Sequence, residues 1–159
     1  MRWYSHLAVG FAISGFIVGV WDFKLMLIVA ISSLLPDLDY PYSLVGSLWP
    51  ELSNFLFKRF GHRGLLHSLL LPLGLIVDIL LSNSFYVNLF CLAYSLHILL
   101  DMMTYQGVKL LYPWDYYFTI LDGDLESNSL GDNLKVTIPC VVLFIVWLLW
   151  KESITAFFA

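Results

Sequence analysis

Charged side chains are scarce in this chain: Asp, Glu, Lys and Arg make up 13% of its 159 residues, whereas apolar residues make up 60%. A soluble domain has about 25% charged residues, so this composition, with a mean hydropathy of +0.81, favours a membrane protein. Positive charge is scarcer than negative, the net charge is -4, and the longest basic cluster is Lys58-Arg59. This balance gives no electrostatic basis for binding nucleic acid, and that function is excluded.

Cysteine is also scarce. The 2 cysteines, Cys91 and Cys140, lie in apolar runs without a CxxC spacing. Their pattern excludes a disulfide framework or a zinc ribbon and predicts small core residues. The N-terminal stretch carries Arg2 before its apolar run and has no clear small-residue cleavage site, so we expect a retained helix rather than a signal peptide.

Long apolar stretches dominate what is present. In a membrane each must form a helix, because a helix satisfies its own backbone hydrogen bonds where water is absent. The sequence therefore predicts an all-α, polytopic membrane bundle of four to five transmembrane helices plus short interfacial helices, in a single integral membrane domain over residues 1–159. The second stretch would cover only about 16 Å, so we expect it to extend through Tyr40 or to form a hairpin with the first. The stretches are Leu7 to Trp21, Leu25 to Leu35, Leu65 to Leu81, Phe85 to Leu100, and Val136 to Trp150.

The polar segments between these stretches are expected to share one membrane face. Counting crossings places the N-terminus, residues 36–64 and residues 101–135 together, including an acidic loop at 122–135 before a last transmembrane helix at 136–150. Most Lys and Arg residues lie in these segments, so the positive-inside rule predicts a cytoplasmic face of the inner or plasma membrane. Trp49-Pro50-Glu51 is typical of a helix start and predicts an interfacial helix.

The few polar residues next to the apolar stretches have the chemistry of metal ligands. His97 and Asp101 are four residues apart, so a helix would present both to a single ion. Asp37 and Asp39 follow Pro36, and such a turn can direct two carboxylates toward one centre. The same face is expected to hold every candidate ligand.

The histidines complete the predicted set. Nitrogen and carboxylate ligands suit zinc, manganese or iron, and the lack of a motif cysteine argues against a closed structural zinc site. We therefore expect an open, catalytic site, and no residue is assigned to an organic cofactor. The predicted ligands are His6, Asp37, Asp39, His62, His67, His97 and Asp101.

Each residue also has a simpler structural interpretation. His6 alone is more typical of an interfacial histidine, and whichever of Asp37 and Asp39 binds no metal would form a cap or turn. Arg63 could belong to the positive-inside signal or clamp a phosphoryl oxygen. Ser68 is interpreted as a packing hydroxyl, since no base remains for it once the histidines bind metal. Convergence at one membrane face favours the metal site over these separate roles.

Taken as an ordered set, the motifs are more specific than any one of them. They are His6, then Pro36-Asp37-Leu38-Asp39, then His62-Arg63-Gly64-Leu65-Leu66-His67-Ser68, then His97-Ile98-Leu99-Leu100-Asp101-Met102-Met103-Thr104, then Gly107 and Leu110-Leu111-Tyr112-Pro113-Trp114. This order resembles the YdjM-like membrane-bound metal-dependent hydrolases, also called LexA-binding, inner-membrane-associated hydrolases. The resemblance covers Met1 to Phe118, with Leu66 where the family usually has Thr and Trp114 where it has Phe.

The resemblance implies that these residues form the site of a hydrolase. It does not identify the substrate. The ligand pattern is also similar to that of zinc-dependent phospholipases C, in which Asp, His and an HxxxD helix hold several zinc ions. This chain has no second HxxxE helix. We therefore expect one or two divalent ions, zinc first, with manganese or iron as alternatives.

From these residues we predict a phosphoesterase, phospholipase-like in its ligands, that uses a metal-activated water to cleave a lipid or lipid-linked substrate. In this prediction Asp37 accepts a proton, Arg63 stabilises charge on phosphoryl oxygens, and His67 binds metal or carries a proton. The alternative is a non-enzymatic metal-binding membrane protein, either a transporter or a scaffold. Leu121-Asp122-Gly123 alone suggests an intramembrane metalloprotease, and the lack of HExxH disfavours it.

Overall fold

The structure is a computed structural model that describes residues 1–18, 22–70, 72–74, 77, 84–120, 125–126 and 129–158. The described residues form no β-strand, only isolated bridges of Thr104 with Leu125 and of Val108 with Phe118. The predicted all-α fold is confirmed. In chain order the elements are α1 (Trp3–Val18), α2 (Phe23–Leu34), the 3-10 helix η1 (Leu35–Asp39), α3 (Leu44–Leu48), α4 (Pro50–Phe60), the 3-10 helix η2 (Leu65–His67), α6 (Phe85–Met102) and α7 (Leu130–Phe158).

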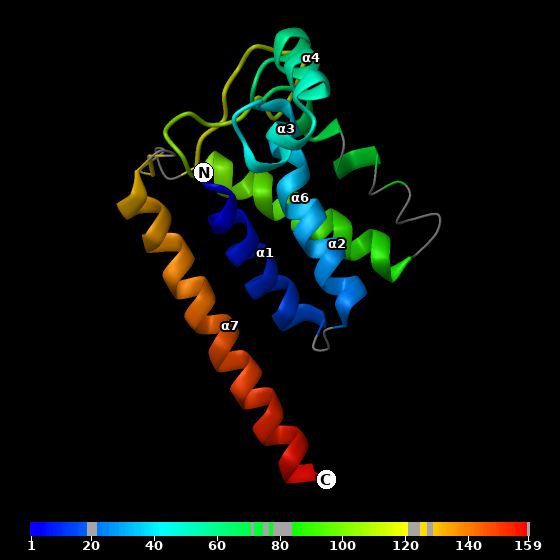
Figure 1. The fold of residues 1–159 in the computed structure, drawn as a ribbon, viewed down its shortest axis with the longest axis vertical. Coiled ribbons are helices and arrows are strands. Elements are labelled where there is room, and N and C mark those ends of the chain that lie inside the picture. The colour runs from blue at the N-terminus through cyan, green and yellow to red at the C-terminus, as the bar shows by residue number, and fades with distance from the viewer. Residues whose placement is uncertain are drawn as a thin grey trace.

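Three helices, α1, α2 and α6, pack together, while α7 runs along α1 and extends past the others (Figure 1). The first two apolar stretches pack as a hairpin, which is one of the two arrangements expected for them. Asp22 caps α2 by accepting a hydrogen bond from the backbone N–H of Leu25 at 2.8 Å. Gly10 lets α1 approach α2 closely, since a Cβ there would lie 2.2 Å from the Ser33 hydroxyl oxygen.

The core is apolar between the helices and partly aromatic toward the end of α6. Leu25 and Val29 of α2 pack against Leu89 and Ala93 of α6. Nearer the end of α6, a second cluster of Tyr94, Ile98 and Val108 holds the following loop against the bundle. Burying an aliphatic side chain of this size contributes about 1.5–3 kcal/mol, so both clusters fix α6 in place. Cys91 is buried in α6, as predicted for a small core residue.

Two described helices are long and apolar enough to cross a membrane, Phe85–Met102 and Asn133–Trp150. The prediction of four to five such helices is wrong for the described part of the chain. α1 is shorter than a full crossing, and α2 stops at Leu34 because Pro36 lacks the N–H that would continue the helix. Of the third stretch, residues 71, 75, 76 and 78–81 lie outside the described residues.

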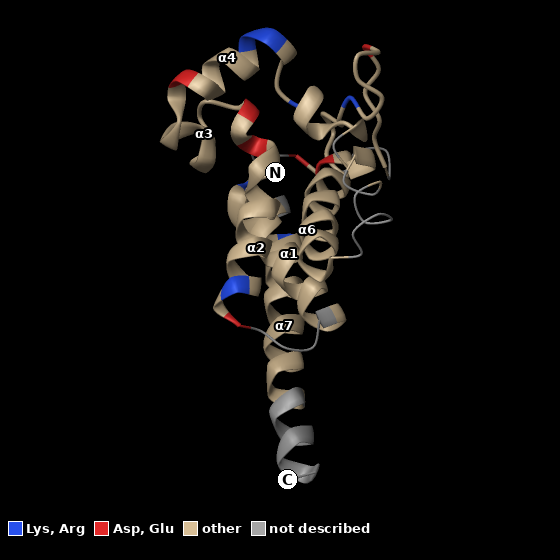
Figure 2. Ribbon diagram, turned by 90° about the vertical axis from the view of Figure 1, so that its right-hand side faces the viewer, with Lys and Arg blue, Asp and Glu red and all other residues tan. Residues whose placement is uncertain are grey.

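The segments predicted to share one membrane face do lie together. Figure 2 shows most charged residues of the described chain at the end of the bundle that carries the N-terminus, α3 and α4. α4 begins with Pro50, as predicted, and buries Ser53 while Leu52 and Phe55 are exposed. α7 begins at Leu130, so the last residues of the predicted acidic loop are helical. Residues 121–124, 127 and 128 of that region, including Leu121-Asp122-Gly123, lie outside the described residues.

Candidate metal centre

Four of the predicted ligands converge at this end of the bundle. Asp37 comes from η1, His67 from η2, and His97 and Asp101 from α6. Each contributes one nitrogen or oxygen atom, these atoms lie within 4.8 Å of one another, and all four residues are buried. The four-residue spacing on α6 places His97 and Asp101 on one face, as predicted, while the turn after Leu34 places Asp37 opposite them.

The orientation of His97 is set by α2. Its Nδ1 donates to the backbone carbonyl of Ser33 at 2.6 Å, so the lone pair belongs to Nε2. That Nε2 lies 3.7 Å from Asp37 Oδ1 and 3.9 Å from Asp101 Oδ2. A histidine held at Nδ1 by a backbone carbonyl is typical of metal-binding imidazoles.

His67 has a matching orientation. Its Nδ1 donates to Asp39 Oδ2 at 3.1 Å, and its Nε2 lies 3.4 Å from Asp101 Oδ2 and 3.3 Å from His97 Nε2. Once His67 loses its Nε2 proton, both imidazoles would direct a lone pair to the same point. A zinc ion about 2.05 Å from each nitrogen in a tetrahedral site holds those nitrogens about 3.3 Å apart. The spacing therefore fits a shared divalent cation.

Asp39 lies behind the four ligands. Its Oδ1 accepts a hydrogen bond from His62 Nδ1 at 2.7 Å, and its Oδ2 accepts from the backbone N–H of Arg63 at 3.1 Å as well as from His67. Burial acts to raise the pKa of Asp39, but the charge of His67 and the hydrogen bonds from both histidines lower it from 3.8 to about 2. Asp39 therefore positions two histidines.

The same ion pair affects His67. Burial acts to lower its pKa, but Asp39 and Asp101 raise it from 6.5 to about 9. A protonated His67 would compensate Asp39, while the Met1 ammonium and the Arg63 guanidinium pair with Asp101. A bound cation would supply the same compensation and would leave His67 neutral.

His6 lies against the group without joining it. Its ring stacks on His97 with centroids 3.6 Å apart, and its Nε2 lies 3.5 Å from Asp101 Oδ1. Both ring nitrogens are buried, and neither makes a hydrogen bond within the described residues. A buried polar atom without a partner is costly, so this nitrogen beside a carboxylate is a second observation that fits a cation.

Arg63 connects the group to the loop after α6. Its Nη2 lies 3.1 Å from Asp101 Oδ1, and its Nη1 donates to Thr104 Oγ1 at 2.8 Å and to the Gly107 carbonyl at 3.2 Å. The chain turns sharply here, with φ values of 74° at Gly61 and 59° at Arg63. Both angles are positive, and this turn directs the Arg63 guanidinium inward.

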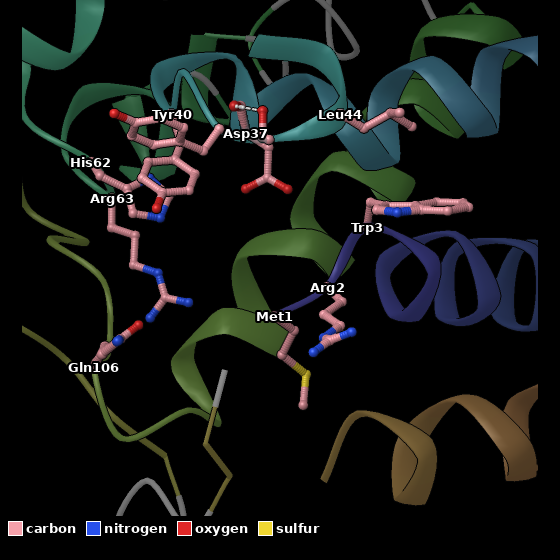
Figure 3. Close-up of a pocket in the computed structure, with 11 residues that line it drawn as sticks. Met1, Arg2, Trp3, Asp37, Tyr40, Leu44, His62, Arg63 and Gln106 are labelled. Atoms are coloured by element: carbon pink, nitrogen blue, oxygen red, sulfur yellow. Dashed lines mark hydrogen bonds between the residues drawn. The ribbon is translucent and has the colours of Figure 1, made fainter. Parts of the chain in front are cut away.

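A pocket of about 260 Å³ opens beside the four ligands (Figure 3). Asp37 belongs both to the ligand group and to the pocket wall. His62, stacked on Tyr40 with centroids 4.6 Å apart, and Arg63 also line it. The pocket residues Tyr40 and Tyr42 were not among the predicted site residues. Their positions one and three residues after Asp39 could have indicated that they belong to the site.

The seven predicted ligands therefore fall into four positions. Asp37, His67, His97 and Asp101 form the group that could hold a metal ion. His6 lies beside it, Asp39 lies behind it, and His62 joins Asp39 to the pocket wall.

Comparison of the chain with known proteins identifies its family. The profile of the family described as YdjM inner membrane protein matches residues 1–157. The chain belongs to the YdjM family. Inner membrane protein YdjM of Escherichia coli (strain K12) and that of Shigella flexneri are each 35% identical to it over 129 residues, 76% of this chain and 62% of the relative. No solved structure matches it significantly.

A more distant relative is the uncharacterized protein YvsG of Bacillus subtilis (strain 168), which is 33% identical over 91 residues, 53% of this chain and 54% of YvsG. The chain spans less than two thirds of the length of the YdjM proteins it matches. The YdjM family description and the two apolar helices together show a membrane protein, with a buried group of Asp and His that could hold a metal ion.

Proposed function

We propose that this YdjM-family protein is a metal-dependent hydrolase that cleaves a phosphoester of a lipid or lipid-linked substrate at the cytoplasmic face of the inner membrane. The observation that carries the proposal is the pair of Nε2 atoms of His67 and His97, 3.3 Å apart and flanked by Asp37 and Asp101. Nitrogen and carboxylate donors without cysteine suit zinc, with manganese or iron as alternatives. A divalent ion held there would supply positive charge and acidify a water molecule.

Asp37 is the residue through which the ligand group reaches the pocket. Figure 3 shows its carboxylate directed into the pocket. A carboxylate in this position can accept a proton from an attacking water molecule at its outer oxygen. Asp37 would thus orient the water as well as contribute to the ligand group.

Arg63 would bind the phosphoryl group. Its guanidinium is buried, lines the pocket and is held by Thr104, Gly107 and Asp101. A guanidinium fixed in this way presents a planar, permanent positive charge to phosphoryl oxygens. It would stabilise the negative charge that develops on them during cleavage.

His62 would give a proton to the leaving oxygen. Its Nδ1 donates to Asp39, so Nε2 is the atom that exchanges a proton, and the imidazole lines the pocket. His67 is also held by Asp39, but its Nε2 faces the ligand group. The two histidines five residues apart would therefore have different roles.

Metal content and lipid turnover test the proposal together. The purified protein in phospholipid nanodiscs is analysed for bound metal and assayed for release of headgroup or phosphate from a panel of lipid phosphoesters. Asp101→Asn and His97→Ala should lose both the metal and the turnover. Asp115→Asn is a matched control, because Asp115 is exposed and pairs with Lys109 outside the ligand group. Unchanged turnover in the Asp101 and His97 variants would exclude this site.

Burial favours a second candidate, a metal-stabilised scaffold without catalysis. The side chains of His67, His97 and Asp101 are at most 1% exposed, as in sites where a metal ties elements together. A protein that binds metal and unfolds on chelation, yet cleaves no lipid phosphoester, would establish the scaffold. Metal flux into proteoliposomes would instead establish a transporter.

A further inference from the structure

The pocket beside the ligand group has two chemically different ends. Asp37, His62 and Arg63 form its polar wall next to the ligands. Trp3 and Leu44 lie at the other end, across the pocket from Arg63, and Arg2 lies below Trp3 in this view (Figure 3). A ligand that fills the pocket would contact charged side chains next to the ligand group, and the apolar surfaces of Trp3 and Leu44 with Arg2 nearby at the other end.

The apolar end is exposed. Trp3 and Leu44 are each 44% exposed, and Tyr42, which also lines the pocket, is 86% exposed. Leu48 and Trp49 continue the exposed surface along the chain. Grouped apolar side chains of this kind mark an interaction surface, and Trp and Tyr favour the boundary between headgroups and hydrocarbon.

The position of this surface along the bundle agrees with that boundary. Asp22 and Lys24 lie at the opposite end of the α1–α2 hairpin, where charged side chains require headgroups or water. From there the 12 residues of α2 rise about 18 Å toward the end of the bundle where most charged residues of the described chain lie (Figure 2). Tyr42 and Leu44 follow η1 at that end.

We propose that the pocket opens sideways into the lipid leaflet, with Trp3, Tyr42 and Leu44 forming an acyl-chain rim. The ligand is a phospholipid whose phosphorylated headgroup enters the polar end while its hydrocarbon chain leaves between Trp3 and Leu44. The chemistry of the headgroup rests on the proposed function, whereas the location of the rim rests on the pocket and the bundle alone. The rim selects substrates by their chain.

Spin labelling tests the location without any need for turnover. Two variants are made in a chain that carries Cys91→Ala and Cys140→Ala, one with Tyr42→Cys and one with Leu44→Cys. Each is spin-labelled at its single cysteine in nanodiscs of phosphatidylcholine and phosphatidylglycerol. Both labels should be more accessible to oxygen than to a water-soluble nickel chelate. A label at Asn54→Cys, on an exposed position of α4, should show the opposite order. Labels at residues 42 and 44 that behave like the one at 54 would overturn the proposal.

Chain selection is tested with two substrates that share one headgroup, a long-chain phospholipid and its water-soluble short-chain analogue. Leu44→Ala should lower the ratio of long-chain to short-chain kcat/KM about tenfold, because an apolar contact is lost for one substrate only. Leu48→Ala is the matched control, since Leu48 is exposed on the same surface outside this pocket. An equal ratio in both variants would contradict the rim. If the parent protein cleaves neither substrate, the proposed function fails, and the spin labels still decide where the rim lies.

Discussion

Gly10 of α1 packs directly against Ser33 of α2, so closely that a Cβ on Gly10 would lie 2.2 Å from the Ser33 hydroxyl oxygen. The Ser33 carbonyl in turn accepts the hydrogen bond from His97 Nδ1. α1 and α2 contribute no nitrogen atom to the ligand group. Their contact nevertheless orients His97, which is one of its two histidines.

Replacing Gly10 with valine should lower both stability and metal content. The larger side chain forces α1 and α2 apart, and overpacking of this kind costs about 1–3 kcal/mol. Thermal unfolding in detergent and zinc per protein molecule are the two measurements. Gly74→Val is the control, since a Cβ at Gly74 meets nothing within 4 Å. Equal losses in the two variants would show that helix propensity, and not the Gly10 contact, is responsible.

Replacing Asp39 with asparagine should weaken metal binding about 10–100-fold, the usual effect of removing the carboxylate that orients a metal-binding histidine. The amide can donate to His67 Nδ1, which would move the ring proton to Nε2 and point it at the ligand group. Isothermal titration with zinc measures the loss, and Asp115→Asn is the control on an exposed carboxylate. An affinity equal to that of the parent would exclude this positioning role.

Replacing His62 with glutamine should leave the metal in place and slow turnover by about 10²–10⁴-fold, the range for loss of a general acid. The loss should be smaller for a nitrophenyl phosphoester, because nitrophenolate needs no proton to depart. Metal analysis and paired kinetics on the two substrates check both statements. Loss of metal from the His62 variant would instead make His62 a ligand.

Metal affinity should rise with pH. The pKa of His67 is raised to about 9, so below that pH a zinc ion must displace one proton from its imidazole. Apparent affinity should then increase about tenfold per pH unit up to about pH 9 and level off above it. Zinc titrations between pH 6 and 10 measure the slope, and a flat profile would mean that His67 does not bind the ion.

The metal-free protein should show the opposite trend in stability. The folded state raises the pKa of His67 from 6.5 to about 9, so its contribution is complete below pH 6.5 and is lost as pH rises through 9. Asp39 is lowered from 3.8 to about 2, so its contribution is complete above pH 3.8 and is lost as pH falls through 2. The joint contribution of Asp39 and His67, measured as the difference in denaturant midpoint between chelated parent protein and its Asp39→Asn variant, should therefore be largest between about pH 4 and pH 6.5.

The predicted site was most accurate where helix geometry alone decides. His97 and Asp101 share a face because residues four apart always do so on a helix. Asp37 and Asp39 could not be told apart in this way. They lie in a 3-10 turn, where residues two apart point in different directions, so one joins the ligands and the other lies behind them.

The number of membrane-spanning helices was predicted less well for a physical reason. Hydropathy reports whether a segment tolerates lipid, but not whether one helix continues through it. Pro36 ends α2, and Gly61 and Arg63 reverse the chain through positive φ angles before η2. The contacts of His62 depend on that reversal and on Asp39, which is 23 residues away, so local sequence did not separate His62 from the ligands.

A single carboxylate, that of Asp39, holds both His62 and His67. Holding an ion and moving a proton would therefore not be independent properties of this protein. A change that shortens the hydrogen bond between Asp39 and His67 also moves His62. Natural variation at position 39 should therefore alter metal choice and reaction rate together. An engineer who wants to exchange the metal without slowing the chemistry should leave Asp39 alone and vary the far side of the group, at His6.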